Sequence, residues 1–146
     1  MIEDVLLTPL KIIEMAEGDV MHSMKSGDAG ESGFGEAYFS NIHFQHVKAW
    51  KRHREMTLNL TVPIGRVRFV IYDDREQSES PGAYQEIILG RNNYQRLTVP
   101  PMLWMGFRGE SEETALILNV ANIRHDPQEA DRKSIDEIAY NWDLKT

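Results

Sequence analysis

The sequence predicts a single all-β domain, folded as a barrel or a sandwich. Short runs of β-branched and aromatic residues recur with turn residues between them, and apolar residues at helical spacing are scarce. The length of 146 residues suits one domain with a sizeable core, and we find neither a repeat nor a linker. We therefore expect one antiparallel domain over residues 1–146.

The first half of the chain is expected to form strands around one flexible loop. Residues 5–13 are apolar and include Pro9, which suits an edge strand because proline donates no backbone hydrogen bond. The glycine-rich segment 27–35 predicts a loop. Strands are then expected at 37–44 and 47–60.

The second half begins with a turn at Gly65, which lies between two β-rich runs. The segment 75–82 reads R-E-Q-S-E-S-P-G and predicts another turn. Strands are expected at 66–72, 84–89, 94–99 and 114–121. A short helix is expected within 127–138, with Glu129, Asp131, Arg132 and Asp136 on its solvated face.

Composition narrows the classes of function. The net charge of −7 argues against a general nucleic-acid binder, which needs a basic face to neutralise phosphates. No apolar run approaches the roughly 20 residues that span a bilayer, and the opening M-I-E-D-V is acidic where a signal peptide is basic. The absence of cysteine excludes disulfides and thiolate sites. These features indicate a cytoplasmic protein with no membrane partner.

One basic window interrupts this acidic chain, and it contains Lys48, Lys51, Arg52, His53 and Arg54. Such a window is either a solvated edge strand, where cations prevent unwanted pairing, or a local site for a carboxylate or diphosphate. Strand alternation places Lys51, His53, Glu55, Thr57 and Asn59 on one polar face of 47–60. That face is either solvated or lines a barrel lumen that holds a polar ligand.

The same region has the outline of the first half-motif of a cupin barrel, H-x-H, then E, then G. Lys51 stands in place of the first His, His53 keeps the second, and Thr57 stands in place of the Glu. Gly65 falls close to the closing glycine. Lysine is a poor partner for a divalent transition ion, so no metal is expected here. His43 and His46 have no metal-like set of partners either.

Motifs spread over residues 18–143 resemble the dTDP-4-dehydrorhamnose 3,5-epimerase family of cupins, especially its shorter members. They are G-D-V-M-H at 18–22, G-F-G-E-A-Y-F-S at 33–40, V-K-A-W-K-R-H-R-E-M-T-L-N at 47–59, Y-D-D-R at 72–75, V-P-P-M-L-W-M-G-F at 99–107, H-D-P at 125–127 and Y-N-W-D at 140–143. The resemblance implies a homodimeric jelly-roll barrel, a double-stranded β-helix, whose lumen binds a nucleotide-linked 4-keto sugar. It also implies a base that removes a proton beside the ketone, an acid that returns one on the other face, and no cofactor.

Several positions depart from the family pattern. Lys51 stands at the place of the family's catalytic His, and Met102 and Met105 replace a Gly and a His of its P-P-G-x-x-H-G-F motif. The family's acid Tyr falls near Asn119. A lysine can act as base, or stabilise an enolate, where burial and neighbouring cations depress its pKa. Lys51 and His53 are thus the candidate catalytic residues, and Arg52, His53 and Arg54 are the neighbours expected to depress the pKa of Lys51.

The resemblance also indicates substrate-binding residues. Lys48 matches a family arginine that holds phosphate. Trp104 follows two prolines and is either a stacking wall for the ligand or a core aromatic. The remaining candidates are Glu36, Thr57, Asn59 and Asn119.

Two classes of function follow. The first is an isomerase that acts on a dTDP-4-keto-6-deoxy sugar. The second is a non-catalytic cupin that binds a sugar nucleotide or another small anionic ligand.

Overall fold

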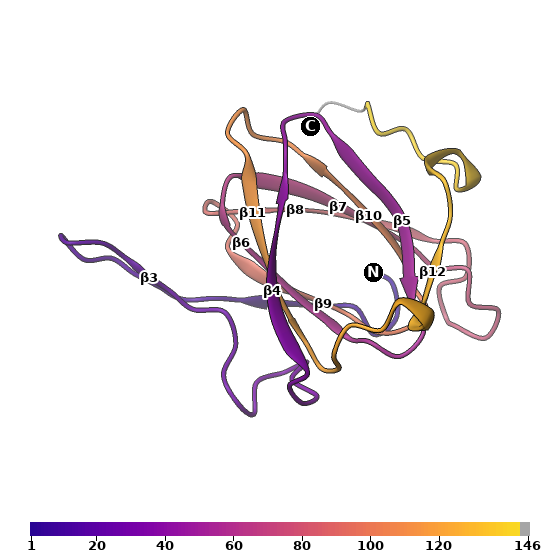
Figure 1. Ribbon diagram of the computed structural model, residues 1–146, viewed down its shortest axis with the longest axis horizontal. Helices are drawn as coiled ribbons and strands as arrows, with labels where there is room; N and C mark the ends of the chain where they lie inside the picture. The colour runs from indigo at the N-terminus through magenta and orange to yellow at the C-terminus, as the bar shows by residue number, and fades with distance from the viewer. Residues whose placement is uncertain (144–146) are drawn as a thin grey trace.

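The computed structural model of the protein describes residues 1–143 and contains two five-stranded antiparallel sheets (Figure 1). The strand order is β1-β9-β6-β11-β4 in the first sheet and β12-β5-β10-β7-β8 in the second. Strands that are neighbours in the sequence, such as β4, β5 and β6, alternate between the sheets. This is the double-stranded β-helix that the motifs indicated.

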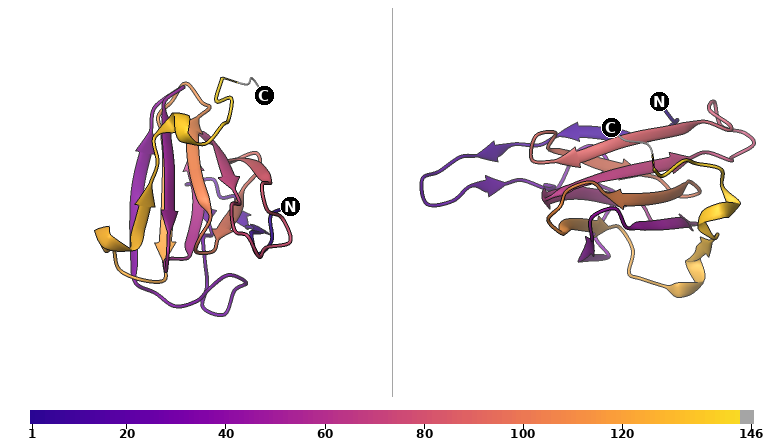
Figure 2. Two further views of the ribbon diagram at one scale, coloured as in Figure 1. Left: turned by 90° about the vertical axis from the view of Figure 1, so that its right-hand side faces the viewer. Right: turned by 90° about the horizontal axis from the view of Figure 1, so that it is seen from above.

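The first sheet contains β1 (Leu6–Pro9), β4 (Glu36–Ile42), β6 (Leu58–Ile64), β9 (Gln95–Val99) and β11 (Ala115–Ala121). The second contains β5 (Val47–His53), β7 (Arg66–Tyr72), β8 (Tyr84–Gly90), β10 (Trp104–Gly109) and β12 (Ala130–Arg132). A small arm, β2 (Ile12–Ile13) paired with β3 (Val20–Met21), projects from the barrel (Figures 1 and 2). Two single-turn 3-10 helices, η1 (Pro127–Glu129) and η2 (Ile135–Glu137), flank β12.

Most strands lie within two residues of their expected positions, and β7 matches its prediction at both ends. Gly65 joins β6 to β7 with φ of 77°, a conformation that favours glycine. A side chain there would also collide with Ala115, whose Cα would lie 2.7 Å from the added Cβ. Strand β10 was not expected. Its Gly106 and Gly109 weaken the strand pattern.

The expected strand 47–60 is corrected, because it breaks into β5 and β6 in different sheets. No glycine or proline marks the break. Side chains from distant segments satisfy the backbone instead: the Glu129 carboxylate accepts N–H groups from Glu55 and Met56, and Asn122 Oδ1 accepts that of Thr57 at 2.7 Å.

Two further expectations are also corrected. The helix within 127–138 is replaced by η1, β12 and η2, because β12 pairs with β5 and needs extended backbone. The strand 5–13 is divided, since β1 pairs with β9 at the edge of the first sheet whereas β2 belongs to the arm.

Apolar side chains fill the space between the sheets and also cover the outside of the second one. The inner core includes Val62, Phe69, Leu89 and Leu97, all buried. On the outer face, Trp50 and Trp104 pack with Val70, Ile138 and Trp142 beneath the C-terminal segment. Each such large side chain contributes about 1.5–3 kcal/mol when fully buried.

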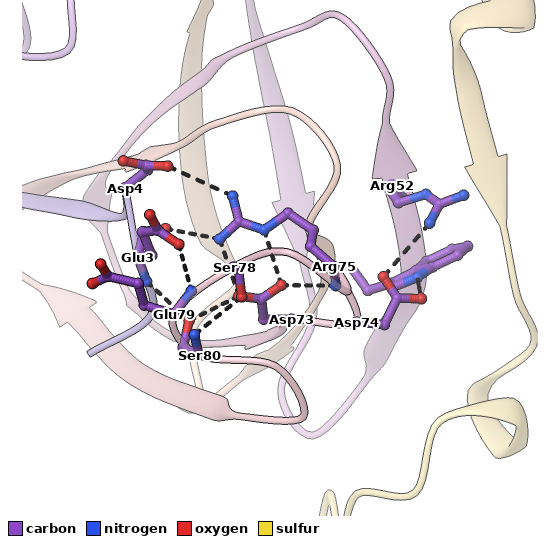
Figure 3. Close-up of polar contacts among 10 residues, drawn as sticks. Glu3, Asp4, Arg52, Asp73, Asp74, Arg75, Ser78, Glu79 and Ser80 are labelled. Carbon is purple, nitrogen blue, oxygen red and sulfur yellow. Dashed lines mark hydrogen bonds and ion pairs between the residues drawn. The ribbon is translucent and has the colours of Figure 1, made fainter.

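The loop after β7 ties the N-terminal segment to the barrel through Asp73 (Figure 3). The buried Asp73 carboxylate accepts hydrogen bonds from Arg75 Nε (2.9 Å), Ser78 Oγ (2.7 Å) and Ser80 Oγ (2.8 Å). Arg75 in turn donates to the Glu3 carbonyl at 3.1 Å. Burial alone would raise the pKa of Asp73, but the bonds from Arg75, Ser78 and Ser80 hold it well below its ordinary value.

Replacing Asp73 by Asn should therefore destabilise the fold by about 2 kcal/mol at pH 7, since hydrogen bonds to a charged group are lost. Because the folded-state pKa is depressed, this stabilisation is present above the unfolded pKa, about 3.9, and is lost as pH falls below it. Urea unfolding at pH 7 and pH 3 measures both effects. Glu76→Gln, at an exposed position in the same loop, is the control, and equal stability of Asp73→Asn and wild type at pH 7 would contradict the account.

Candidate active site

A cavity of about 440 Å³ lies inside the barrel, within the size range of small-molecule sites. Its apolar wall is formed by Met56, Leu58, Leu60, Phe69, Val99, Leu103, Met105, Phe107 and Ile117. Polar side chains on its lining include Tyr38, Ser40, Lys48, Lys51, His53, Asn119 and Arg132. The polar groups come from β4 and β11 in the first sheet and from β5 and β12 in the second, so both sheets supply polar side chains to the cavity.

Strand alternation explains how β5 contributes to this cavity. Lys51 and His53 line it, whereas Trp50 packs in the outer aromatic cluster and Arg52 binds Asp131 through Nη2 at 2.7 Å. The outward cation Arg54 is also bound to Asp131. The basic window is therefore divided: Lys48, Lys51 and His53 line the cavity, and the other two members are neutralised outside.

His53 is the most constrained polar residue of the cavity. Its side chain is 8% exposed, and Nδ1 forms a hydrogen bond to Glu129 Oε1. The other Glu129 oxygen accepts the backbone N–H groups of Glu55 and Met56 at 3.0 and 3.3 Å. Because Nδ1 is engaged by the carboxylate, the ring is fixed with Nε2 available to a ligand.

Electrostatics favour neutral His53 beside ionised Glu129. Burial lowers the pKa of His53, the hydrogen bond to Glu129 raises it in part, and the charge of Lys51 lowers it further. Burial raises the pKa of Glu129, but the bonds from His53 and Glu55 outweigh burial and lower it overall. A neutral imidazole held by a carboxylate can accept a proton and stabilise the resulting imidazolium.

Lys51 also has a lowered pKa, first because of burial and then because of Arg132, while Glu129 opposes the shift. Arg132 is the residue opposite Lys51 in the β12–β5 pair, so both side chains face the same way. The expected direction of the shift thus holds, and so does burial as one of its causes, but the neighbouring cation is Arg132 and not the expected Arg52, His53 and Arg54. Arg52 and Arg54 are bound to Asp131 on the outer face and are not responsible.

Two other sequence candidates also reach the cavity. Lys48 Nζ is held by the carbonyl oxygen of Asn41 at 2.9 Å, at an exposed position on β5. Asn119 lies on β11, where its Oδ1 accepts the N–H of Asn59 at 3.0 Å and its Nδ2 donates to the Tyr38 hydroxyl at 2.9 Å.

The remaining four candidates do not line the cavity, and the expectation that Thr57 and Asn59 point into the lumen is corrected. Asn59 follows the break in the chain and faces outward, where it bonds to Gly30 and Thr98. Thr57 lies in the break itself. Trp104 belongs to the outer aromatic cluster and donates Nε1–H to Asp74 at 2.9 Å (Figure 3 shows Asp74 beside Arg52). Glu36 accepts the N–H of His125 at the start of β4 and is not on the cavity lining.

Sequence reasoning missed three residues of this site, namely Glu129, Arg132 and Tyr38. Arg132 was expected on a solvated helix face, but it lines the cavity from β12. Glu129 was placed on a solvated helix face, yet it is 5% exposed because η1 ends there and the chain turns inward to pair with β5. Residues 126–129, D-P-Q-E, form a capped turn in which the Asp126 side chain accepts the N–H of Gln128. This local pattern is the one signal in the sequence for a single turn at this position. Tyr38 was visible only as part of the G-F-G-E-A-Y-F-S motif.

Among residues 1–143, no three His, Cys, Asp or Glu side chains are grouped so that they could hold a metal ion. Over the same part of the chain, no helix has the length and apolar character needed to cross a membrane.

Comparison with known proteins supports the fold described above. No protein-family model matches the sequence. The dTDP sugar isomerase of Desulfovibrio desulfuricans G20 is 38% identical, with a TM-score of 0.94 over 97% of this chain and 92% of that chain. A Haloferax volcanii protein named "Probable low-salt glycan biosynthesis epimerase Agl13" is 33% identical over 100 residues, which are 68% of this chain and 64% of that protein. This chain thus matches less than two thirds of the Haloferax protein.

The fold is also that of the dTDP-4-dehydrorhamnose 3,5-epimerase of Elizabethkingia anophelis NUHP1, at 18% identity and a TM-score of 0.79 over 99% of this chain and 84% of that one. A double-stranded β-helix with a ligand-sized cavity between its sheets is typical of a cupin barrel. The chain belongs to the dTDP-4-dehydrorhamnose 3,5-epimerase-like (dTDP-sugar isomerase) family of these barrels.

Proposed function

We propose that this protein is a nucleotide-sugar epimerase or isomerase that removes a proton next to the ketone of a dTDP-linked 4-keto-6-deoxy sugar. The observation that carries the proposal is the buried His53–Glu129 pair on the wall of a ligand-sized cavity. The similarity to a dTDP sugar isomerase supports the choice of substrate. The reaction needs no metal ion, because a 4-keto group already acidifies the neighbouring C–H bond and a positioned base can remove the proton.

His53 is the base in this proposal. Its Nε2 takes the proton from the sugar carbon, and Glu129 stabilises the imidazolium that results. Glu129 is thus a positioning residue rather than a group that touches the sugar. Neutral His53 is the form that accepts a proton, and the lowered pKa keeps this form dominant at pH 7.

Lys51 stabilises the enolate. It lies two residues before His53 on the same face of β5, so the two side chains are about 6–7 Å apart along the strand. That spacing suits a base at carbon and a cation at the neighbouring ketone oxygen. A lysine of lowered pKa also donates a stronger hydrogen bond to a developing oxyanion.

The charged part of the substrate is assigned to the cationic side chains that remain. Lys48 on β5 and Arg132 on β12 are both exposed and both line the cavity. The ammonium group of Lys48 can bind the diphosphate as a point charge. The planar guanidinium of Arg132 can donate two parallel hydrogen bonds to it. In a chain of net charge −7, these two cations also attract an anionic ligand to their part of the cavity.

We also propose a cytoplasmic homodimer. The absence of cysteine fits a reducing compartment. A two-stranded arm is marginal by itself in water, yet Ile13 and Val20 are paired on one exposed face of it. A second copy of the chain would cover that face, and the projection of the arm away from its own barrel makes it accessible (Figure 2).

Hydrogen exchange tests the proposed reaction. Wild type incubated with dTDP-4-keto-6-deoxyglucose in deuterated water should incorporate deuterium at ring carbon, as measured by mass spectrometry and proton NMR. His53→Asn should slow incorporation at least about 100-fold, since the base is lost. Lys51→Met should slow it by roughly 100- to 1,000-fold, because the enolate loses its cation.

His22→Asn and Lys25→Met, which change the same residue types outside the cavity, should exchange at the wild-type rate. Wild type that binds the dTDP sugar but incorporates no deuterium would favour the binding-module alternative. Equal rates for wild type and His53→Asn would remove His53 from its role.

Sedimentation velocity at micromolar concentration tests the dimer. Wild type should sediment as a dimer, and Val20→Asp should shift it to monomer, because a charge is buried against an apolar surface. Ala16→Asp adds the same charge at the tip of the arm and should leave the dimer intact. A monomeric wild type would contradict the proposal.

A further inference from the structure

Lys51 presents a primary amine to the part of the cavity that is assigned to the ketone. It lines the cavity from β5, between its cross-strand neighbours Met105 on β10 and Arg132 on β12. Neither neighbour carries a negative charge, and within residues 1–143 no carboxylate forms an ion pair with Lys51 Nζ. The amine is therefore left to react with a ligand.

Lys48, which also lies on the cavity lining, is placed differently. Its Nζ donates a hydrogen bond to the Asn41 carbonyl at 2.9 Å. It lies three residues before Lys51 and five before His53 on β5, and three residues of an extended strand span about 10 Å. Lys51 is thus the lysine of this strand that can reach a ketone beside the carbon that His53 deprotonates.

The surroundings of Lys51 also favour the neutral amine. Burial lowers the pKa of Lys51, the charge of Arg132 lowers it further, and the charge of Glu129 opposes the shift. A neutral amine is a nucleophile toward a carbonyl carbon, whereas an ammonium group is not. Proteins activate lysine for this chemistry by desolvation or by a second cation, and Lys51 has both.

We propose that Lys51 forms a covalent iminium with the ketone carbon of the sugar, and that His53 removes the proton from the carbon beside this iminium. The inference rests on the function proposed above and deepens it, because the stabilising cation becomes bonded to the sugar. A positively charged nitrogen attracts the electron pair of the neighbouring C–H bond more strongly than a ketone oxygen does. The proton is therefore removed more easily from the iminium than from the free ketone.

The position of His53 suits this arrangement. Lys51 and His53 leave β5 on the same face, about 6–7 Å apart. This separation accommodates a nitrogen bonded to one sugar carbon and a base at the next carbon. Met105, directly opposite Lys51, and Leu103 are apolar members of the cavity lining. Such side chains exclude water from the iminium and so protect it from hydrolysis while the proton is transferred.

The reaction releases one water and later consumes one. The neutral amine of Lys51 adds to the ketone carbon, and the resulting hydroxyl takes up one proton from solvent and leaves as water, which forms the iminium. His53 Nε2 takes the neighbouring C–H proton, and the electron pair of that bond forms an enamine. A proton from solvent returns to the carbon, and the imidazolium releases its own to solvent. Water then adds to the iminium, the ketone and the free amine separate, and one proton returns to solvent.

Reductive trapping tests the covalent step in wild type. Sodium cyanoborohydride should convert the iminium formed with dTDP-4-keto-6-deoxyglucose into a stable amine. Mass spectrometry of the intact protein should show one addition equal to the sugar nucleotide less one oxygen atom, and peptide mapping should place it on Lys51. dTDP-glucose, which carries a hydroxyl in place of the ketone, should give no adduct. Lys25→Met, at an exposed position outside the cavity lining, should be trapped like wild type.

Lys51→Arg separates a covalent role from a purely electrostatic one. The guanidinium keeps the positive charge but stays protonated, so it forms no iminium. This variant should give no adduct and should lose deuterium exchange by at least about 100-fold. Its binding of dTDP, measured by calorimetry, should remain close to that of wild type, because Lys48 and Arg132 are retained.

Deuterium exchange by wild type without an adduct on Lys51 would overturn the iminium and leave the proposed function in place. Equal labelling of Lys51 and the exposed Lys25 would overturn it as well, because the reaction would then be unspecific. Exchange by Lys51→Arg within about 10-fold of wild type would have the same consequence, since charge alone would then suffice. Absence of exchange in wild type would overturn both the iminium and the proposed function.

Discussion

The buried contact between His53 and Glu129 joins the architecture of this barrel to its proposed chemistry. The Glu129 carboxylate holds His53 Nδ1 and also satisfies backbone N–H groups at the break between β5 and β6. The Glu129 carbonyl accepts the N–H of Arg54 at 2.8 Å, and β12 begins at the next residue and pairs with β5. One side chain thus allows the chain to pass between sheets and orients the candidate base. Removing it would leave buried polar groups unpaired, at a cost of about 1–3 kcal/mol each.

The charges of the basic window are divided between two environments by the alternation of β5. Arg52 and Arg54 are neutralised outside by Asp131, whereas Lys51 and His53 remain in the lumen. An unpaired cation in a partly buried cavity is unfavourable until an anionic ligand arrives. This division explains how an acidic protein places cationic side chains on the lining of its cavity.

The sequence predicted those features that depend on local chemistry. Alternation placed Lys51 and His53 on one face, and Gly65 marked a turn that needs positive φ. The position of Asn59 could not be predicted, because the intervening break uses side chains of Glu129 and Asn122, which lie more than 60 residues away. Nothing in residues 54–57 shows where the missing backbone partners come from.

Strand β10 was hidden for a related reason. Gly106 reads as a weak strand residue, yet a Cβ there would lie 2.6 Å from that of Ala49 and 2.8 Å from the ring of Trp142. The requirement for glycine comes from neighbours distant in sequence, as does the requirement for Glu129.

Nitrogen-15 NMR titration of His53, assigned with His53→Asn, tests the central contact most directly. The account predicts the Nδ1–H tautomer at pH 7 and a pKa below the ordinary 6.5. An Nε2–H tautomer, or a pKa above 6.5, would contradict it.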